Sequence, residues 1–165
     1  MLSIDSARTF FKYSDWANGQ ILSAAAKLDD AALDQPFEMG RGSLRLTLMH
    51  IHAGEHVWLQ RWHGRTETPW PDEDERVAPA ALADRFAETR AARDQFLAAL
   101  KDADLARSIP YRDSKGGLFK ATLADMLTQG ILHSHHHRAQ AVNMLRRAAG
   151  VEVELDYMMW VRQPA

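Results

Sequence analysis

Cysteine is absent from the 165 residues of this chain. Its absence excludes disulfide bonds, thiolate metal ligands, iron–sulfur clusters and cysteine nucleophiles. The chain also lacks any apolar run approaching the roughly 20 residues of a membrane-spanning helix. The opening Met-Leu-Ser-Ile-Asp has neither the basic start nor the apolar stretch of a secretory signal. We therefore expect a soluble, cytoplasmic protein with no membrane partner, in which any metal ion is held by His, Asp or Glu.

A large excess of charge of one sign is also missing. The formal net charge is −2, and lysine and arginine are scattered along the chain without forming a basic stripe. Such a chain has no general attraction for phosphate backbones, so we expect no nucleic-acid partner. The composition, 46% hydrophobic and 25% charged, is typical of globular proteins. Its length predicts a single domain over residues 1–165 with one hydrophobic core.

Apolar residues recur at helical spacing in four stretches, which are separated by glycine, proline and acidic residues. Cap and stop residues set the expected ends of each stretch. The four predicted helices run from about Asp5 to Leu28, from Leu44 to about His63, from Pro79 to about Lys101, and from Thr122 to about Gly150. Trp58 and Trp62, one turn apart in the second helix, are assigned to the core. The sequence thus predicts an all-α protein, with these helices packed as a bundle.

Three segments between or after these helices lack a long helical pattern. Residues 69–75 are acidic and contain two prolines, which is typical of a solvated loop. Residues 109–120 carry Pro110 and two glycines between short apolar pieces, so we expect a small hairpin or an ordered loop before the last helix. The tail, residues 151–165, is rich in large apolar side chains that would be costly to expose together. It is expected to pack on the bundle or against a second subunit.

Eight histidines form two groups: His50, His52, His56 and His63, and then His133, His135, His136 and His137. In the last helix His133 and His137 are four residues apart and lie within the inward apolar stripe. Two hydrogen-bonded core histidines are one interpretation. We favour half of a metal site, because two neutral imidazoles on one face can share a cation more easily than a core can satisfy both. His135 and His136 point away from the stripe and receive no metal role.

The second helix offers two alternatives for completing that site. His50 could supply a third ligand from across the bundle. Alternatively, His52, Glu55 and His56 match H-x-x-E-H, in which two histidines bind zinc and the glutamate acts as a base. That short pattern arises easily by chance in a chain with eight histidines, and we treat it as a decoy. Helical angles place His50 and His52 at similar offsets on opposite sides of the apolar stripe, so they leave the choice open.

Glu55 lies near the centre of the apolar stripe of the second helix. A carboxylate there needs a partner, which could be a metal ion, a histidine N–H or an arginine. A catalytic role and a simple buried ion pair are both compatible with this position. Glu55 is therefore the candidate catalytic residue.

Three sequence segments together resemble the DinB-like (DinB/YfiT) family of metal-dependent enzymes. They are residues 13–18 (Tyr-Ser-Asp-Trp-Ala-Asn), residues 48–51 (Leu-Met-His-Ile) with Glu55 and Trp58, and residues 133–140 (His-Ser-His-His-His-Arg-Ala-Gln). The last is similar to the family pattern H-x-x-H-H-R-G-Q, with Ala139 where the family often has glycine. This small-for-small change should not disturb the ligands.

The resemblance implies a fold and a ligand set. The fold is a four-helix bundle with up-down-down-up connections, commonly dimeric. The ligands are the histidine before Ile51, which is His50, together with His133 and His137. The chemistry implied is less uniform, and it includes transferases and an isomerase that use low-molecular-weight thiols.

Three neutral imidazoles leave the double charge of a zinc, nickel or iron ion uncompensated and leave coordination positions open, which is typical of catalytic sites. We therefore expect a metal-dependent S-transferase or hydrolase that activates a low-molecular-weight thiol or water for attack on a small electrophile. Arg138 or Gln140 could anchor a substrate carboxylate. The alternative is a metal-binding stress-response protein without turnover.

Overall fold

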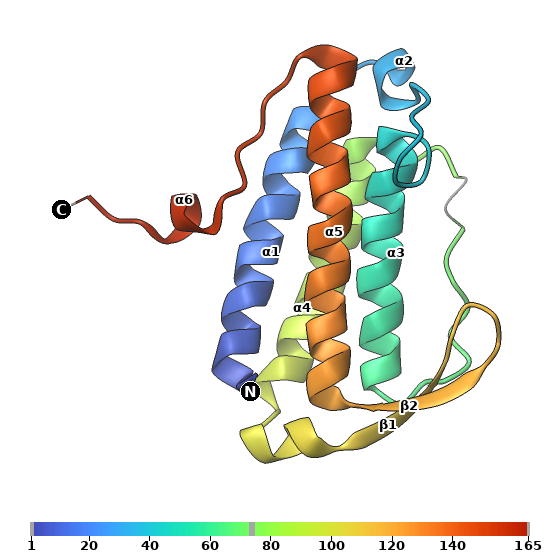
Figure 1. The fold of residues 1–165 in the computed structure, drawn as a ribbon, viewed down its shortest axis with the longest axis vertical. Coiled ribbons are helices and arrows are strands. Elements are labelled where there is room, and N and C mark those ends of the chain that lie inside the picture. The colour runs from blue at the N-terminus through green and yellow to red at the C-terminus, as the bar shows by residue number, and fades with distance from the viewer. Residues whose placement is uncertain (1, 73–74, 165) are drawn as a thin grey trace.

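The computed structural model describes residues 2–72 and 75–164, and four long helices dominate it (Figure 1). These are α1 (Ile4–Ala25), α3 (Leu44–Trp62), α4 (Pro79–Ala98) and α5 (Leu123–Ala149). The shorter elements are the helices α2 (Asp30–Leu33), η1 (Asp102–Ala106) and α6 (Tyr157–Val161), and the strands β1 (Ser108–Arg112) and β2 (Leu118–Thr122).

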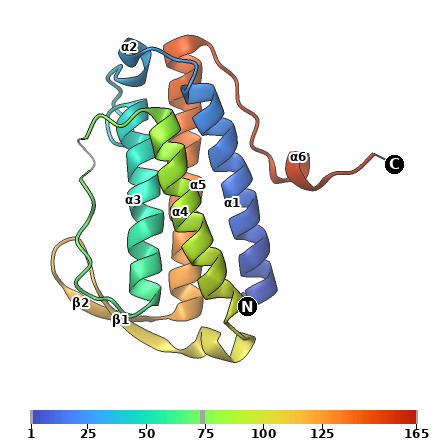
Figure 2. The same ribbon diagram turned by 180° about the vertical axis from the view of Figure 1, so that it is seen from behind.

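The long helices form a bundle with up-down-down-up connections. In Figure 1, α1 and α5 run upward and α3 and α4 run downward. Helices α4 and α5 each pack against both α1 and α3. Seen from behind, α4 lies between α1 and α3 on the face opposite α5 (Figure 2). The predicted all-α bundle and its unusual order of directions are therefore confirmed.

Side-chain caps explain where the helices begin. The hydroxyls of Ser3, Ser43 and Thr122 accept hydrogen bonds from the backbone N–H groups at the starts of α1, α3 and α5. Helix α5 ends at Gly150, whose φ of +65° suits a residue without a side chain. Helices α1 and α4 end at Ala25 and Ala98, three residues before the ends expected from the apolar pattern. Both continue into tighter turns with i to i−3 backbone bonds.

Residues between η1 and α5 form an antiparallel hairpin, β1 and β2, in which Ile109 pairs with Ala121. The hairpin therefore confirms the first of the two predicted alternatives for this segment. Ile109 is buried against hydrophobic residues at the end of α3 and the start of α5. Strand β1 contacts α3, and strand β2 contacts α5. The hairpin lies below the lower ends of α3 and α5 (Figure 1).

The buried hydrophobic residues form two clusters, whereas the sequence suggested one core. The first cluster joins the C-terminal part of α1 to the start of α3 and the end of α5. The second joins the start of α1 to the end of α3 and the start of α5. Between the two clusters each long helix carries buried polar residues, including Ser14 in α1, Glu55 in α3, Arg93 in α4 and Ser134 in α5. The assignment of residues 1–165 to a single domain stays a prediction.

The tail packs back on the bundle, which is one of the two expected alternatives. The Tyr13 hydroxyl of α1 donates to the Leu155 carbonyl, and the Tyr13 ring lies 5.3 Å from that of Tyr157 and 6.0 Å from that of Trp160. Met158 remains 61% exposed. In the described ranges, no helix combines the length and the apolar character needed to cross a membrane.

Candidate metal centre

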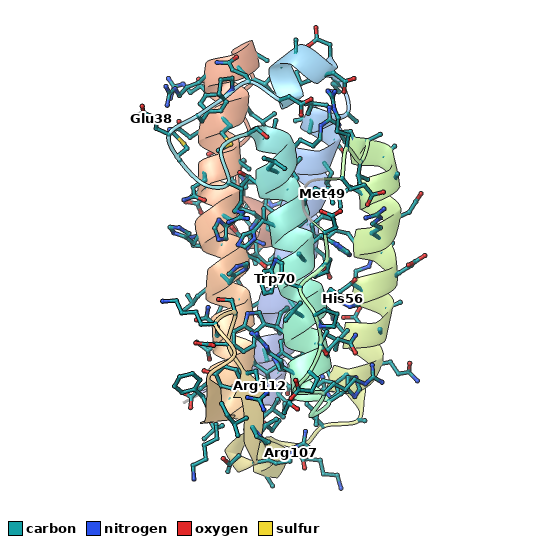
Figure 3. All side chains as sticks on the ribbon, turned by 90° about the vertical axis from the view of Figure 1, so that its right-hand side faces the viewer. Glu38, Met49, His56, Trp70, Arg107 and Arg112 are labelled. Atoms are coloured by element: carbon teal, nitrogen blue, oxygen red, sulfur yellow. The ribbon has the colours of Figure 1, made fainter. Side chains whose placement is uncertain are left out.

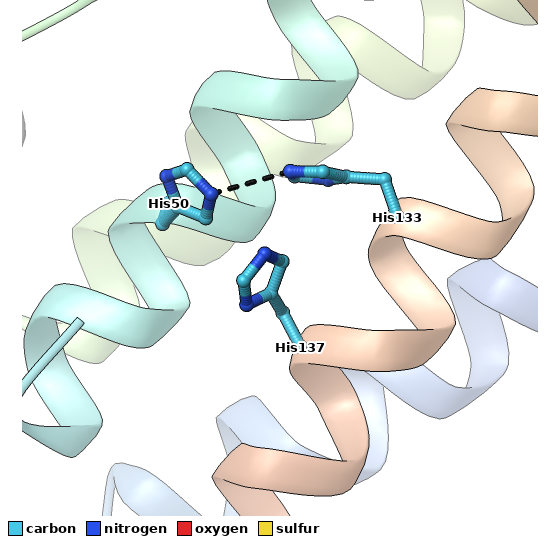
Figure 4. Close-up of side chains that lie close together, drawn as sticks. All are labelled: His50, His133 and His137. Carbon is cyan, nitrogen blue, oxygen red and sulfur yellow. Dashed lines mark hydrogen bonds between the residues drawn. The ribbon is translucent and has the colours of Figure 1, made fainter. Parts of the chain in front are cut away.

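Three half-buried histidines from two helices converge between α3 and α5. His50 comes from α3, and His133 and His137 come from successive turns of α5 (Figure 4). One nitrogen from each ring lies within 4.8 Å of the other two. Because all three residues lie within long helices, the packing of α3 against α5 fixes the geometry of the cluster. It could hold a metal ion, as expected for these three residues.

The distances within the cluster suit an ion with nitrogen ligands. His133 Nε2 and His50 Nε2 are 3.2 Å apart. Two ligands at about 2.0–2.1 Å from a tetrahedral zinc ion lie roughly 3.3 Å from each other. The His137 ring centroid is 4.4 Å from that of His50 and 4.6 Å from that of His133. The donor set therefore fits a divalent ion such as zinc, nickel or iron, and its geometry does not distinguish among them.

Gly54 creates the space in which the His133 ring lies. A Cβ atom at position 54 would stand 2.6 Å from His133 Nδ1, which is closer than any ordinary contact. The ring of a ligand on α5 therefore lies directly against the backbone of α3. This close approach places His133 opposite His50 one turn earlier on α3.

Gln140 orients the third ligand. The His137 Nδ1–H donates to Gln140 Oε1 over 2.7 Å, which leaves Nε2 as the ligand atom. Gln140 Nε2 in turn donates to His136 Nε2 over 3.1 Å. Burial lowers the pKa of His137, which is partly offset by the bond to Gln140, so the neutral form needed by a ligand persists at neutral pH. Gln140 therefore contacts a candidate ligand.

An open cavity of about 800 Å³ adjoins the cluster, and His50 and His133 belong to its wall. Aromatic residues line much of the rest, including Trp58, Trp70 and Tyr111. The Trp70 ring lies 5.5 Å from that of His50. Trp58, expected in the core, is indeed buried but also borders this cavity. A small molecule in the cavity would reach both histidines.

The H-x-x-E-H pattern faces a different part of the bundle. His52 Nε2 lies 3.2 Å from Thr89 Oγ1 of α4, and its ring packs 5.2 Å from that of Phe86. His56 is on the side of α3 toward α4 in Figure 3. The structure therefore brings His50, and not His52, to the α5 histidines.

Glu55 lies in a buried polar network between the helices. Its Oε1 accepts hydrogen bonds from Asn18 Nδ2 at 2.9 Å and from Ser134 Oγ at 3.0 Å, and its Oε2 is 4.0 Å from Arg93 Nη1. Arg93 also forms a two-pronged ion pair with Asp15. An arginine was one of the three partners expected for this carboxylate. The catalytic role assigned to Glu55 stays a prediction.

The arginine that lines the cavity is not the one expected from the sequence. Arg138 was considered as a substrate anchor, but it is almost completely buried and its Nη1 donates to Ser14 Oγ and Asn18 Oδ1. Arg61, which the sequence did not single out, lines the cavity instead. Its only sequence signal is its position three residues after Trp58 on the same face of α3.

Family membership follows from the whole length of the sequence. A model of the DinB family matches residues 3–165. The chain belongs to the DinB family. Protein DinB of Bacillus subtilis (strain 168) is 22% identical over 162 residues, which cover 95% of this chain and 94% of that protein.

Two solved structures share the fold of this DinB-family chain. A DinB-like protein from Bacillus cereus ATCC 10987 superimposes with a TM-score of 0.72 at 23% identity, covering 92% of this chain and 96% of that chain. A conserved protein from Enterococcus faecalis gives a TM-score of 0.64 at 16% identity, covering 92% and 100%. At these identities the likeness concerns the fold.

Proposed function

We propose that this protein is a metal-dependent enzyme in which His50, His133 and His137 hold one divalent ion, with zinc or nickel preferred. The ion would activate a low-molecular-weight thiol or water for attack on a small electrophile. The observation that carries the proposal is that the three histidines gather beside an open cavity of about 800 Å³, with His50 and His133 in its wall. A purely structural ion is normally enclosed by four protein ligands.

The described side chains have separable roles in this proposal. Bound at three imidazoles, a divalent ion supplies Lewis acidity that lowers the pKa of a thiol or water ligand. Gln140 fixes the His137 ring so that Nε2 faces the cluster. Trp58 and Trp70 would exclude water from an apolar substrate. Glu55 accepts a hydrogen bond from Ser134, the residue after His133 in α5, and would thereby position that helix. In its catalytic role, Glu55 would also transfer a proton directly.

The first experiment measures the metal content of protein purified without a His-tag or chelator. Wild type is compared with His50→Ala and His137→Ala, and His52→Ala serves as the matched control on α3. We expect about one ion per chain in the wild type and in His52→Ala, and none in the two ligand variants. Retention of the ion in His137→Ala would remove the proposed site, and loss in His52→Ala would restore the H-x-x-E-H alternative.

Turnover is tested next on the loaded wild type, with a monohalogenated alkyl electrophile and simple thiols. Thiol consumption that requires the ion and is lost in His50→Ala supports a transferase. Ion binding without any turnover would instead favour the alternative, a non-catalytic metal-binding protein of the stress response. The open cavity beside the histidines favours the enzyme.

A homodimer is also proposed, on the basis of the family resemblance and the apolar tail. Met158 and Val161 of α6 are exposed although both are large and hydrophobic. Sedimentation of the wild type against a chain ending at residue 150 tests this: we expect a dimer that the truncation weakens. The cytoplasmic location and the absence of a nucleic-acid partner stay predictions.

A further inference from the structure

Arg61 is a buried cation at the inner wall of the cavity. Only 8% of its surface is exposed, although it lies near the end of α3 and lines the same cavity as His50 and His133. Removing a guanidinium from water is costly unless carboxylates or several hydrogen bonds replace the lost hydration. The partners of Arg61 therefore show whether the fold alone accounts for its burial.

The fold supplies Arg61 with few partners. Its guanidinium has five N–H donors, and among the described residues it makes one hydrogen bond, from Nη2 to the Arg112 carbonyl over 2.7 Å. Within the described ranges no carboxylate oxygen lies within 4.0 Å of it. The guanidinium instead lies 4.7 Å from the centre of the Trp58 ring and 5.4 Å from that of Tyr111. Burial lowers its pKa, but an arginine stays charged at neutral pH.

The two acidic residues in the cavity wall are engaged elsewhere. Asp113 Oδ1 accepts the backbone N–H groups of Lys115 and Gly117 in the hairpin turn, at 2.9 and 2.8 Å. Asp125 Oδ2 accepts the Thr122 hydroxyl at the start of α5, at 2.6 Å. Asp113 contributes a favourable longer-range charge to Arg61. Neither acid takes the donors of Arg61, so the cavity has a positive end with unused hydrogen-bonding capacity.

The position of this cation relative to the histidines sets the size of a ligand. Arg61 follows His50 by eleven residues on α3, which corresponds to roughly 16 Å along the helix axis at 1.5 Å per residue. Trp58 and Tyr111 line the cavity on the Arg61 side, and Trp70 lines it beside His50. A molecule that touches both ends must therefore be elongated, with an anion at one end and an apolar body.

We propose that Arg61 binds the carboxylate of an elongated, partly apolar substrate or cosubstrate whose reactive end reaches the three histidines. This inference rests on the proposed function for the reactive end, whereas the carboxylate anchor can be measured without a metal ion. Carboxylate and guanidinium match as two parallel charge-assisted hydrogen bonds, and the stacked aromatic rings hold the guanidinium plane in place.

The test uses 4-phenylbutyrate and its neutral analogue 4-phenylbutan-1-ol as probes, with binding measured by calorimetry on the full-length, metal-free protein. The variants are Arg61→Gln, Arg61→Lys and the exposed control Arg90→Gln on α4. We expect Arg61→Gln to weaken phenylbutyrate binding by about tenfold or more, Arg61→Lys to lose less, and Arg90→Gln to match the wild type. Binding of the alcohol should be the same in all four proteins.

Equal phenylbutyrate affinity in wild type and folded Arg61→Gln would overturn the inference. So would a loss that follows Arg41→Gln instead, which changes another arginine of the cavity wall. Circular dichroism checks folding. If Arg61→Gln does not fold, Arg61→Lys takes its place, and unchanged phenylbutyrate affinity in that variant would overturn the inference, because lysine cannot form the paired hydrogen bonds. Metal content is measured separately. A protein that binds phenylbutyrate through Arg61 but no ion would contradict the proposed function and leave the anchor standing.

The carboxylate could belong to the thiol or to the electrophile, and 6-mercaptohexanoate distinguishes these sources. If it binds the metal-loaded protein more tightly than hexanoate does, and Arg61→Gln weakens both, the thiol carries the carboxylate. If the thiol adds no affinity while phenylbutyrate still depends on Arg61, the electrophile carries it. Both results support the anchor.

Discussion

The two polar clusters between α3 and α5 differ in what completes them. In the network around Glu55, the described contacts come from the protein itself: Asn18, Ser134 and Arg93 surround the carboxylate. In the histidine cluster, three ring nitrogens within 4.8 Å of one another face a common point beside an open cavity. Imidazole nitrogens so close together need a proton or a cation between them.

This difference separates a polar cluster that joins the helices from one that could hold a metal ion. Burial and charge alone do not make the distinction, because Glu55 and Arg93 are more deeply buried than the histidines. What distinguishes the clusters is their composition and position: an ion pair and hydrogen bonds surround Glu55, whereas three imidazoles gather beside an open cavity. Each of the first three predictions below changes one of these clusters, and the fourth concerns His52 on the α4 side of α3.

The largest effect is expected from removing the cation of the Glu55 network. Arg93→Met leaves Asp15 and Glu55 buried without their shared partner. We expect the free energy of unfolding in urea to fall by about 3–5 kcal/mol, while the folded fraction still binds its metal ion. The control is Arg90→Met, one turn earlier and exposed, which should change stability little. A loss below about 1 kcal/mol would contradict this interpretation of the network.

The next largest effect is expected on metal affinity, with the stability of the fold left unchanged. Gly54→Ala places a Cβ atom against the His133 ring, the movable end of a flexible side chain. The ring must shift, so we expect metal affinity to fall by roughly 100-fold. Stability of the metal-free protein should stay equal or rise slightly, since alanine favours helix by up to about 1 kcal/mol. Gly19→Ala on α1, where a Cβ meets open space, is the control. Unchanged metal affinity in Gly54→Ala would show that the position of His133 does not matter.

A smaller effect is expected from the hydrogen bond that orients His137. Gln140→Leu removes the acceptor for His137 Nδ1–H, and metal affinity should fall by about tenfold. Gln140→Glu keeps an acceptor at the same distance from the backbone and should restore most of that affinity. Competition with a metal-indicator dye measures all three proteins. If the glutamate variant binds as weakly as the leucine variant, the hydrogen bond is not the cause.

The smallest effect is a pH dependence on the α4 side of α3. Burial lowers the pKa of His52 below its usual 6.5, although the charge of Glu55 partly offsets this. The unfolded chain therefore binds a proton at His52 that the folded protein resists, so stability is lost as the pH falls below about 6.5. In metal-free protein, His52→Gln should reduce this loss, whereas His135→Gln, on the exposed face of α5, should not. Equal slopes in both variants would assign the loss to other groups.

Much of the fold follows from local patterns that survive without tertiary information. Caps at Ser43 and Thr122 and the stop at Gly150 place the ends of α3 and α5, and the four-residue spacing of His133 and His137 puts both on one face. The end of α1 was less predictable, because Lys27 and Leu28 continue in a tighter turn that has the same apolar spacing. An arginine was among the expected kinds of partner for Glu55, but which residues contact it could not be predicted, since they come from three other helices.

By itself the sequence determined the helices, the absence of thiolate ligands and the paired histidines of α5, because these depend on residue type and on spacing within one helix. Spacing along the helix left His50 and His52 as alternatives and only the family resemblance favoured His50; the tertiary structure shows that His50 faces His133 and His137. The rotation of α3 about its axis depends on its packing against α4 and α5: Thr89 and Phe86 contact His52, and Gly54 admits the His133 ring. The same rotation, together with the hairpin, places Arg61 in the cavity, a position that spacing along one helix cannot reveal.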